Sequence, residues 1–115
     1  MNEPTLKIIF FKSDAGTEPV REWLRGLTAS ERKAIGEDIK TVQYGWPLGM
    51  PLVRKMKKDL WEVRVTLENK IARILFTVEE QQMMLLHGFV KKSPATPATD
   101  LQTAMNRLKK LRSEL

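Results

Sequence analysis

"LWEVRVTLENKIARILFTVEEQQMMLLHGFVKK", residues 60–92, contains the clearest strand pattern in the chain. Apolar and polar residues alternate in its first segment, LWEVRVTL, and a period of two is typical of a strand with one buried face. Two further apolar segments follow, IARILFTV and MMLLHGFVKK, and the polar turns ENK and EEQQ separate them. Turns this short join neighbouring strands that run in opposite directions. The stretch therefore predicts an antiparallel meander of three strands.

Side chains alternate between the two faces of a strand, so the register predicts which residues meet. The face expected to be buried takes Trp61, Val63, Val65, Ala72, Ile74, Phe76, Val78, Met84, Leu86, Gly88 and Val90. The opposite face then takes Arg64, Arg73, Leu85, His87, Phe89 and Lys91. If the three strands align, two arginines, the single histidine, an aromatic ring and a lysine share one surface of the sheet.

Segments before the meander predict one strand and two helices. Residues 6–11, LKIIFF, form the strand. Thr17 is expected to cap a first helix whose apolar residues recur at intervals of three and four, and Thr28 or Ser30 to cap a second. The apolar faces of these helices are Val20, Trp23, Leu24 and Leu27, then Ile35, Ile39 and Val42. Residues 44–56, with two prolines and two glycines, are expected to be a loop.

A final helix is expected to begin near Asp100, with Leu101, Met105, Leu108 and Leu111 on one face. Its basic residues are expected to be solvated or to form a docking surface. The fold class is therefore α+β, with a small antiparallel sheet in the order strand, two helices, three strands and helix. The length of 115 residues suits a single domain over residues 1–115.

Composition excludes several classes of protein. Hydrophobic residues at 42% and charged residues at 30% are typical of a globular chain, and the apolar runs are too short to span a bilayer. The N-terminal segment MNEPTLKIIFF lacks the pattern of a secretory signal, so we expect a cytoplasmic protein with no membrane partner. The chain has no cysteine and one histidine, and we expect it to need no metal and no cofactor.

A net charge of +6 and a pI near 9.8 favour an anionic partner, with nucleic acid first among the candidates. Arginine can contact phosphate through two hydrogen bonds, an aromatic ring can stack on an unpaired base, and lysine or histidine can move protons. The residues expected to do this are Arg64, Arg73, His87 and Lys91 in catalysis, and Phe89, Lys92, Lys55, Lys57 and Lys58 in RNA binding.

Most of these residues also have a plain structural interpretation. His87 suits a half-buried, hydrogen-bonded histidine, and Phe89 suits the core. Arg64 beside Glu62 suits an ordinary surface arginine, and Lys91 with Lys92 suits a solvated strand end. Arg73 interrupts an apolar strand and therefore needs a partner there. The three tryptophans, Trp23, Trp46 and Trp61, are expected to anchor the core.

The segments LWEVRV, ARILF and LLHGFVKKSPATPATDLQTAMNRL resemble the RelE/ParE toxin superfamily, in particular its HigB-like branch, also described as phage Gp49-like proteins. The resemblance implies a microbial ribonuclease-like α+β fold and a toxin of a type II toxin-antitoxin pair. It also implies cleavage of messenger RNA on the ribosome without metal, and a cognate antitoxin, often a helix-turn-helix protein.

Carried over by position, the resemblance places Arg64 at a basic strand residue, Arg73 at the phosphate-contacting arginine, and Lys91 or Lys92 at a basic strand end. Two positions depart from the pattern: Ala72 stands where related chains often have an aromatic residue, and Pro94-Ala95 replaces a more polar stretch. The superfamily also contains ParE-like members that inhibit gyrase without cutting RNA. A gyrase inhibitor and a basic interaction module are therefore the alternatives to an endoribonuclease.

Overall fold

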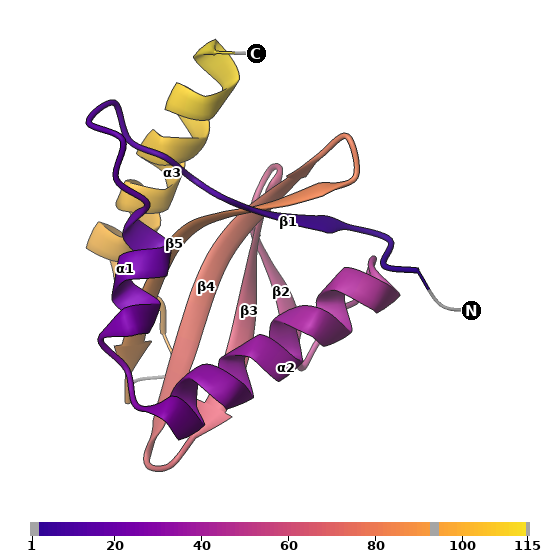
Figure 1. Ribbon diagram of the computed structural model, residues 1–115, viewed down its shortest axis with the longest axis vertical. Coiled ribbons are helices and arrows are strands. Elements are labelled where there is room, and N and C mark those ends of the chain that lie inside the picture. Colours follow the sequence, from indigo (N-terminus) through magenta and orange to yellow (C-terminus); the bar gives the residue numbers. More distant parts are fainter. Residues whose placement is uncertain (1–2, 93–94, 115) are drawn as a thin grey trace.

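The computed structural model describes residues 3–92 and 95–114, and its elements confirm the α+β class. They are β1 (Lys7–Phe10), α1 (Pro19–Arg25), α2 (Ala29–Gly45), β2 (Val53–Lys57), β3 (Leu60–Leu67), β4 (Lys70–Glu79), β5 (Gln82–Lys91) and α3 (Ala98–Ser113). The strands form one sheet in the order β1-β5-β4-β3-β2, and only β1 runs parallel to its neighbour. The expected meander is β3, β4 and β5 (Figure 1).

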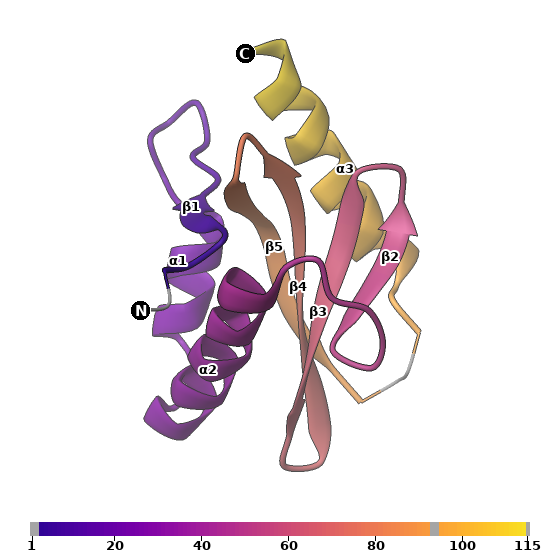
Figure 2. The same ribbon diagram turned by 90° about the vertical axis from the view of Figure 1, so that its right-hand side faces the viewer.

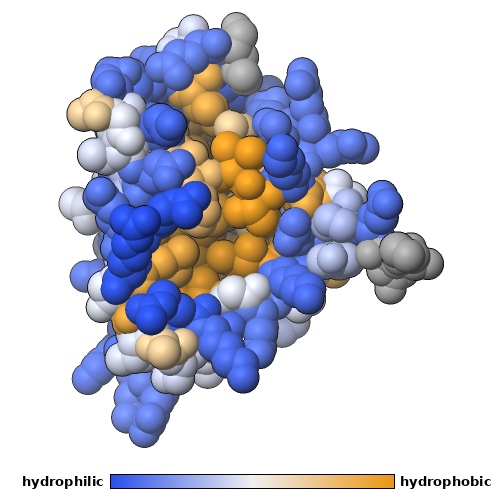
Figure 3. All heavy atoms as spheres, in the orientation of Figure 1, coloured by the Kyte–Doolittle hydropathy of each residue, from blue (hydrophilic) through white to orange (hydrophobic). Residues whose placement is uncertain are grey.

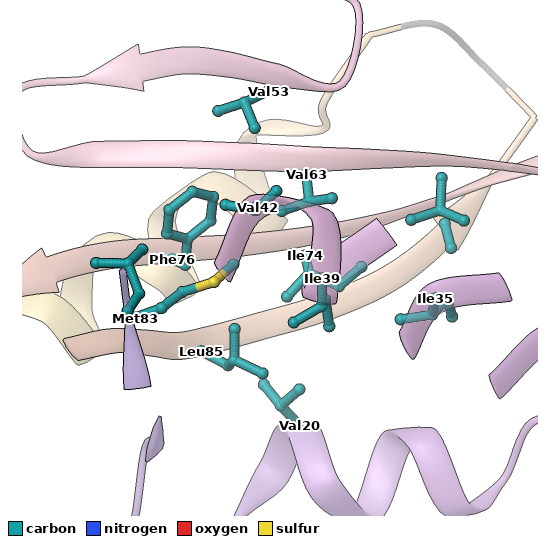
Figure 4. Close-up of a cluster of buried hydrophobic side chains, with 13 residues drawn as sticks. Val20, Ile35, Ile39, Val42, Val53, Val63, Ile74, Phe76, Met83 and Leu85 are labelled. Carbon is teal, nitrogen blue, oxygen red and sulfur yellow. The ribbon is translucent and has the colours of Figure 1, made fainter. Parts of the chain in front are cut away.

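The sheet forms the middle layer of the molecule. Figure 2 shows α1 and α2 on one side of it and α3 on the other. On the side of α1 and α2, the close-up in Figure 4 shows Val20, Ile39, Ile74 and Leu85 pointing into one cluster. Trp46 packs against this cluster, with its ring 5.0 Å from that of Trp61 and 5.6 Å from that of Phe76. Figure 3 views the molecule from this side and shows apolar side chains gathered at the centre within a polar border.

The strand β2 corrects the prediction of a loop over residues 44–56. It pairs with β3 at the edge of the sheet and presents Arg54, Lys55 and Lys57 to solvent, while Val53 is buried. Edge strands are often charged in this way, because unpaired edges would otherwise aggregate. The charges hide the alternation of apolar residues from which the other strands were predicted.

Helix ends also differ in part from the prediction. Thr17 does not cap α1: the N-cap is Glu18, which makes no side-chain capping bond, and Pro19 occupies the first turn. Thr28 caps α2 through a reciprocal pair of hydrogen bonds with Glu31, so Thr28 rather than Ser30 is the cap. Glu31 also contacts Lys70 at 2.6 Å, and hydrogen bonds from Lys70 and from the backbone of Thr28 lower the pKa of Glu31 to about 2. The start of α2 is thus tied to the β3–β4 turn.

Gly88 allows α1 to approach β5 closely. A Cβ atom at this position would lie 2.3 Å from Cε3 of Trp23, within the space that the indole ring occupies. We therefore expect Gly88→Ala to lower the free energy of unfolding by about 1–3 kcal/mol, because the ring must shift. Urea denaturation measures this. Gly36→Ala is the matched control: that position lies within α2 with no neighbour inside 4 Å, and alanine there should be neutral or stabilising. Equal stabilities of the two variants would contradict the close approach.

Candidate functional site

The basic residues predicted to share a surface do lie on one face of the sheet. In the register of the meander, Arg64 pairs with Arg73, and Arg73 pairs with Phe89. Two residues further along β4, Leu75 is aligned with His87 on one side and Glu62 on the other, and two residues in the opposite direction Ile71 is aligned with Lys91. This alignment is confirmed, and the face in question is the one toward α3.

A β-bulge corrects part of the expected pattern in β5. Leu75 pairs with His87 but Phe76 pairs with Leu85, so Leu86 is an extra residue without a partner on β4. Every residue before the bulge is therefore on the opposite side from the prediction. Leu85 lies in the core beneath α1 and α2, whereas Leu86 packs beneath α3. Met84, which is aligned with Thr77, likewise lies on the α3 side. His87 comes after the bulge and keeps its predicted face.

The helix α3 covers this face, which the sequence had suggested was an open surface. Leu101, Ala104, Leu108 and Leu111 of α3 pack against the sheet. Met105, expected among them, points outward instead and is 37% exposed. As a result Phe89 is only 7% exposed and belongs to the core, and Arg73 is fully buried. In this conformation Phe89 offers no open face on which a base can stack.

Arg73 lies in a buried polar network at the centre of the face. Its Nη1 atom is 3.6 Å from Oε1 of Glu62, which is also fully buried, and it donates a hydrogen bond of 3.1 Å to the hydroxyl of Thr96. That hydroxyl donates to the other oxygen of Glu62 at 2.6 Å. Arg64 approaches the same carboxylate, with Nε 3.8 Å from Oε1. One carboxylate thus holds two arginines side by side, and Thr96 bridges that carboxylate to Arg73.

Burial has an electrostatic consequence for Arg73. Desolvation is the main cause that lowers the pKa of its guanidinium below the usual value. The charge of Glu62 raises this pKa, and the charges of Arg64 and Arg54 lower it further. Two arginines beside one carboxylate, with Arg54 opposite Glu62 in the strand register, leave an excess of positive charge. Such an excess, in a site of low dielectric constant, favours the binding of an anion such as a phosphate group.

A second network joins His87 to α3. Its Nε2 atom is 2.7 Å from Oδ1 of Asp100, and Nη1 of Arg107 is 3.4 Å from its Nδ1. The same Arg107 donates a hydrogen bond of 2.8 Å to the carbonyl of Leu86, the unpaired residue of the bulge. The imidazole also stacks on Phe89, with 5.6 Å between the ring centroids. Both ring nitrogens are therefore engaged by α3, and the interpretation of His87 as a half-buried, hydrogen-bonded residue is correct for this conformation.

A comparison with known families identifies the chain. Residues 22–109, which include every residue of the two networks, match the model of the phage-derived Gp49-like proteins (DUF891). The chain belongs to this Gp49-like family. The family is related to the toxins of toxin-antitoxin systems. A search among curated proteins found no match.

The remaining predicted residues of this Gp49-like protein lie outside the two networks. Lys91 and Lys92 are exposed at the end of β5, and Lys91 projects on the same face as Arg73. Lys55 is exposed on β2, while Lys57 and Lys58 lie beside α3. Pro94, one of the two departures from the family pattern, lies outside the described residues. Ala72 is buried beneath α1 and α2, on the face away from the networks. The catalytic and RNA-binding roles of all these residues stay predictions.

Sequence patterns did not indicate three members of the two networks, and they gave Glu62 too small a role. Thr96, Asp100 and Arg107 follow the meander, and no local pattern marks them as neighbours of the sheet. The signal in the sequence for Glu62 is an acid in the middle of an alternating strand, near an arginine that is expected to need a partner, which is a sign of a buried pair. Among the described residues no group of three acidic, histidine or cysteine side chains is placed to hold a metal ion. None of the helices in the described part of the chain has the length and hydropathy of a membrane-spanning segment.

Proposed function

We propose that this Gp49-like protein is the toxin of a type II toxin-antitoxin pair, of the HigB-like kind, and that it cleaves messenger RNA on the ribosome without a metal ion. The observation that supports this best is the pair Arg64 and Arg73, held side by side on adjacent strands by Glu62. Two adjacent guanidinium groups suit the dianionic transition state of phosphoryl transfer. The relation of the family to toxins supports the same function.

The proposed reaction is an attack of a ribose 2′-oxygen on the adjacent phosphorus. The new oxygen–phosphorus bond forms as the 2′-hydroxyl gives up its proton to a base. The bond from phosphorus to the 5′-oxygen of the next nucleotide then breaks, and that oxygen receives a proton from an acid. The products are a 2′,3′-cyclic phosphate and a 5′-hydroxyl end. Arg64 and Arg73 stabilise the charge that builds up on the phosphate oxygens.

His87 and Lys91, the two candidates for proton transfer, differ in how accessible they are. His87 is engaged at both nitrogens by Asp100 and Arg107, whereas Lys91 is exposed on the same face. With α3 packed on the sheet, which we call the closed conformation, Lys91 is therefore better placed than His87 to move a proton. Arg73 lies beneath Thr96, so contact with a phosphate requires the segment that carries Thr96 to move away from the sheet.

The ends of the cleaved RNA test this proposal. We expect fragments from a translation reaction that contains the purified protein to carry 2′,3′-cyclic phosphate or 3′-phosphate ends, and new 5′-hydroxyl ends. Arg64→Ala should reduce cleavage by about 100-fold or more, because a donor to the transition state is lost. Lys33→Ala, an exposed change on α2 on the other side of the sheet, is the matched control and should cleave normally. Fragments that carry only 3′-hydroxyl ends would contradict attack by the 2′-oxygen.

One observation favours the non-catalytic alternative. Arg73 and Phe89 are both buried in the closed conformation. A protein that stays in this conformation would have to inhibit its target by binding alone, as a ParE-like inhibitor of gyrase does. Expression of the protein in growing cells separates the two functions. New messenger RNA ends support the ribonuclease, whereas a DNA-damage response with intact messenger RNA supports the inhibitor.

A further inference from the structure

A groove with an apolar floor runs between α3 and the turn that joins β2 to β3. Figure 2 shows these two parts of the molecule side by side. Leu60 of β3, with Met105 and Leu108 of α3, supplies the apolar part of its lining. Leu60 and Leu108 are buried, but Met105 is 37% exposed. An exposed methionine is adaptable in shape, and such residues are common on surfaces that bind helical or extended segments.

Positive charge surrounds this floor. Lys57 and Lys58 line the groove from the strand side, and Lys109 lines it from α3. Arg112 lies at one end, where it is paired with Asp59 at 2.7 Å and Glu79 at 3.4 Å. No acidic residue is among the described residues that line the groove. The groove thus combines an apolar centre with a cationic border.

This combination indicates which kind of molecule fits. An RNA backbone would pair with the lysines, but its bases stack best on aromatic rings, and none is among the described residues of the lining. An amphipathic segment with acidic residues satisfies both parts, because its apolar side chains cover Met105 while its carboxylates face the lysines. The groove therefore suits an acidic amphipathic segment better than it suits RNA, with which the sequence had associated Lys57 and Lys58.

We infer that this groove is the docking site for an acidic amphipathic segment of an inhibitory protein partner, an inference that rests on the proposed toxin function. A segment in the groove contacts α3 and the β2–β3 turn together. The helix α3 carries Asp100 and Arg107, and Thr96 immediately precedes it. A bound segment thus holds α3 against the sheet and keeps Thr96 over Arg73. The partner inhibits the toxin from outside the site, without entering it.

Binding of a synthetic peptide tests the groove directly. The peptide is designed to form a helix with leucines on one face and glutamates on the other, and a scrambled peptide of the same composition is the control. We expect the amphipathic peptide to bind the full-length protein more tightly than the scrambled one, and less tightly as salt is raised. In nuclear magnetic resonance spectra, the amide signals of residues 57–60 and 102–112 should shift. Shifts confined to α1 and α2 would overturn the inference.

Charge reversal provides the matched variants. The double variant Lys57→Glu, Lys109→Glu should weaken peptide binding by about tenfold or more, since it places like charges opposite the glutamates. Lys33→Glu, Lys40→Glu changes the net charge equally on the exposed side of α2 and should have a much smaller effect. If a short single-stranded RNA loses affinity for the groove variant while the peptide does not, the groove is an RNA contact and the inference is wrong.

Hydrogen exchange tests whether a bound segment holds α3 against the sheet. We expect the amphipathic peptide to slow amide exchange in α3 between Leu101 and Leu108, while the scrambled peptide leaves it unchanged. Peptide binding without slower amide exchange in α3 would overturn the inference that the partner keeps α3 packed on the sheet. These measurements use no cleavage assay. A protein that binds the peptide but cuts no RNA would therefore contradict the proposed ribonuclease and leave the docking site standing.

Discussion

Replacing Arg73 with alanine is expected to lower the free energy of unfolding by about 3–5 kcal/mol, because it leaves the Glu62 carboxylate buried without one of its two arginine partners. The same change is expected to reduce RNA cleavage by 100-fold or more, on the order typical of a lost charge-stabilising donor. Urea denaturation and cleavage in a translation reaction measure the two effects. An unchanged stability would contradict the buried ion pair.

The two effects of this substitution must be separated, because an unstable toxin also loses its toxicity. The double variant Glu62→Met, Arg73→Met removes both charges and fills similar volumes, and apolar replacements of buried ion pairs are often neutral or stabilising. We expect it to recover most of the lost stability and to remain inactive. A folded double variant that still arrests growth would show that neither Arg73 nor Glu62 takes part in the reaction.

Phe89 is the second position at which a large effect is expected. It packs between the sheet and α3, in contact with the cluster that contains Ala104 and Leu108. Phe89→Ala should therefore lower the free energy of unfolding by about 3–5 kcal/mol, the usual result of removing a buried ring. Phe89→Leu retains most of the apolar volume and should cost less than about 1.5 kcal/mol.

The leucine variant decides whether the ring has a second role. If Phe89 serves the core alone, Phe89→Leu will fold and will remain as toxic as the parent protein. If the ring stacks on a base once α3 has moved, the variant will fold normally but cleave RNA poorly. Denaturation curves and growth arrest, measured on the same variant, distinguish these outcomes. The burial of Phe89 in the closed form favours the first.

Local sequence patterns were sufficient to predict the meander, its face of basic residues and the helices α2 and α3, but not that α3 covers that face. Alternation in residues 60–67 and spacing by three and four in α2 and α3 are local patterns, and each reflects the direction in which neighbouring side chains point. For this reason Arg64, Arg73, His87 and Lys91 could be placed on one side of the sheet. The pattern failed at Met84, Leu85 and Leu86, because one extra residue reverses every side chain before it.

How these residues are joined depends on contacts between segments that are distant in the sequence. Thr96 lies 34 residues from Glu62 and 23 from Arg73, and Asp100 lies 13 residues from His87. Such pairs form when α3 folds back over the sheet, and a local pattern carries no information on where a distant segment returns. Burial also changes what these residues can do: Arg73, which was expected to need a partner on its apolar strand, is paired with the buried Glu62, and Phe89, which was expected to stack on a base, is part of the core beneath α3.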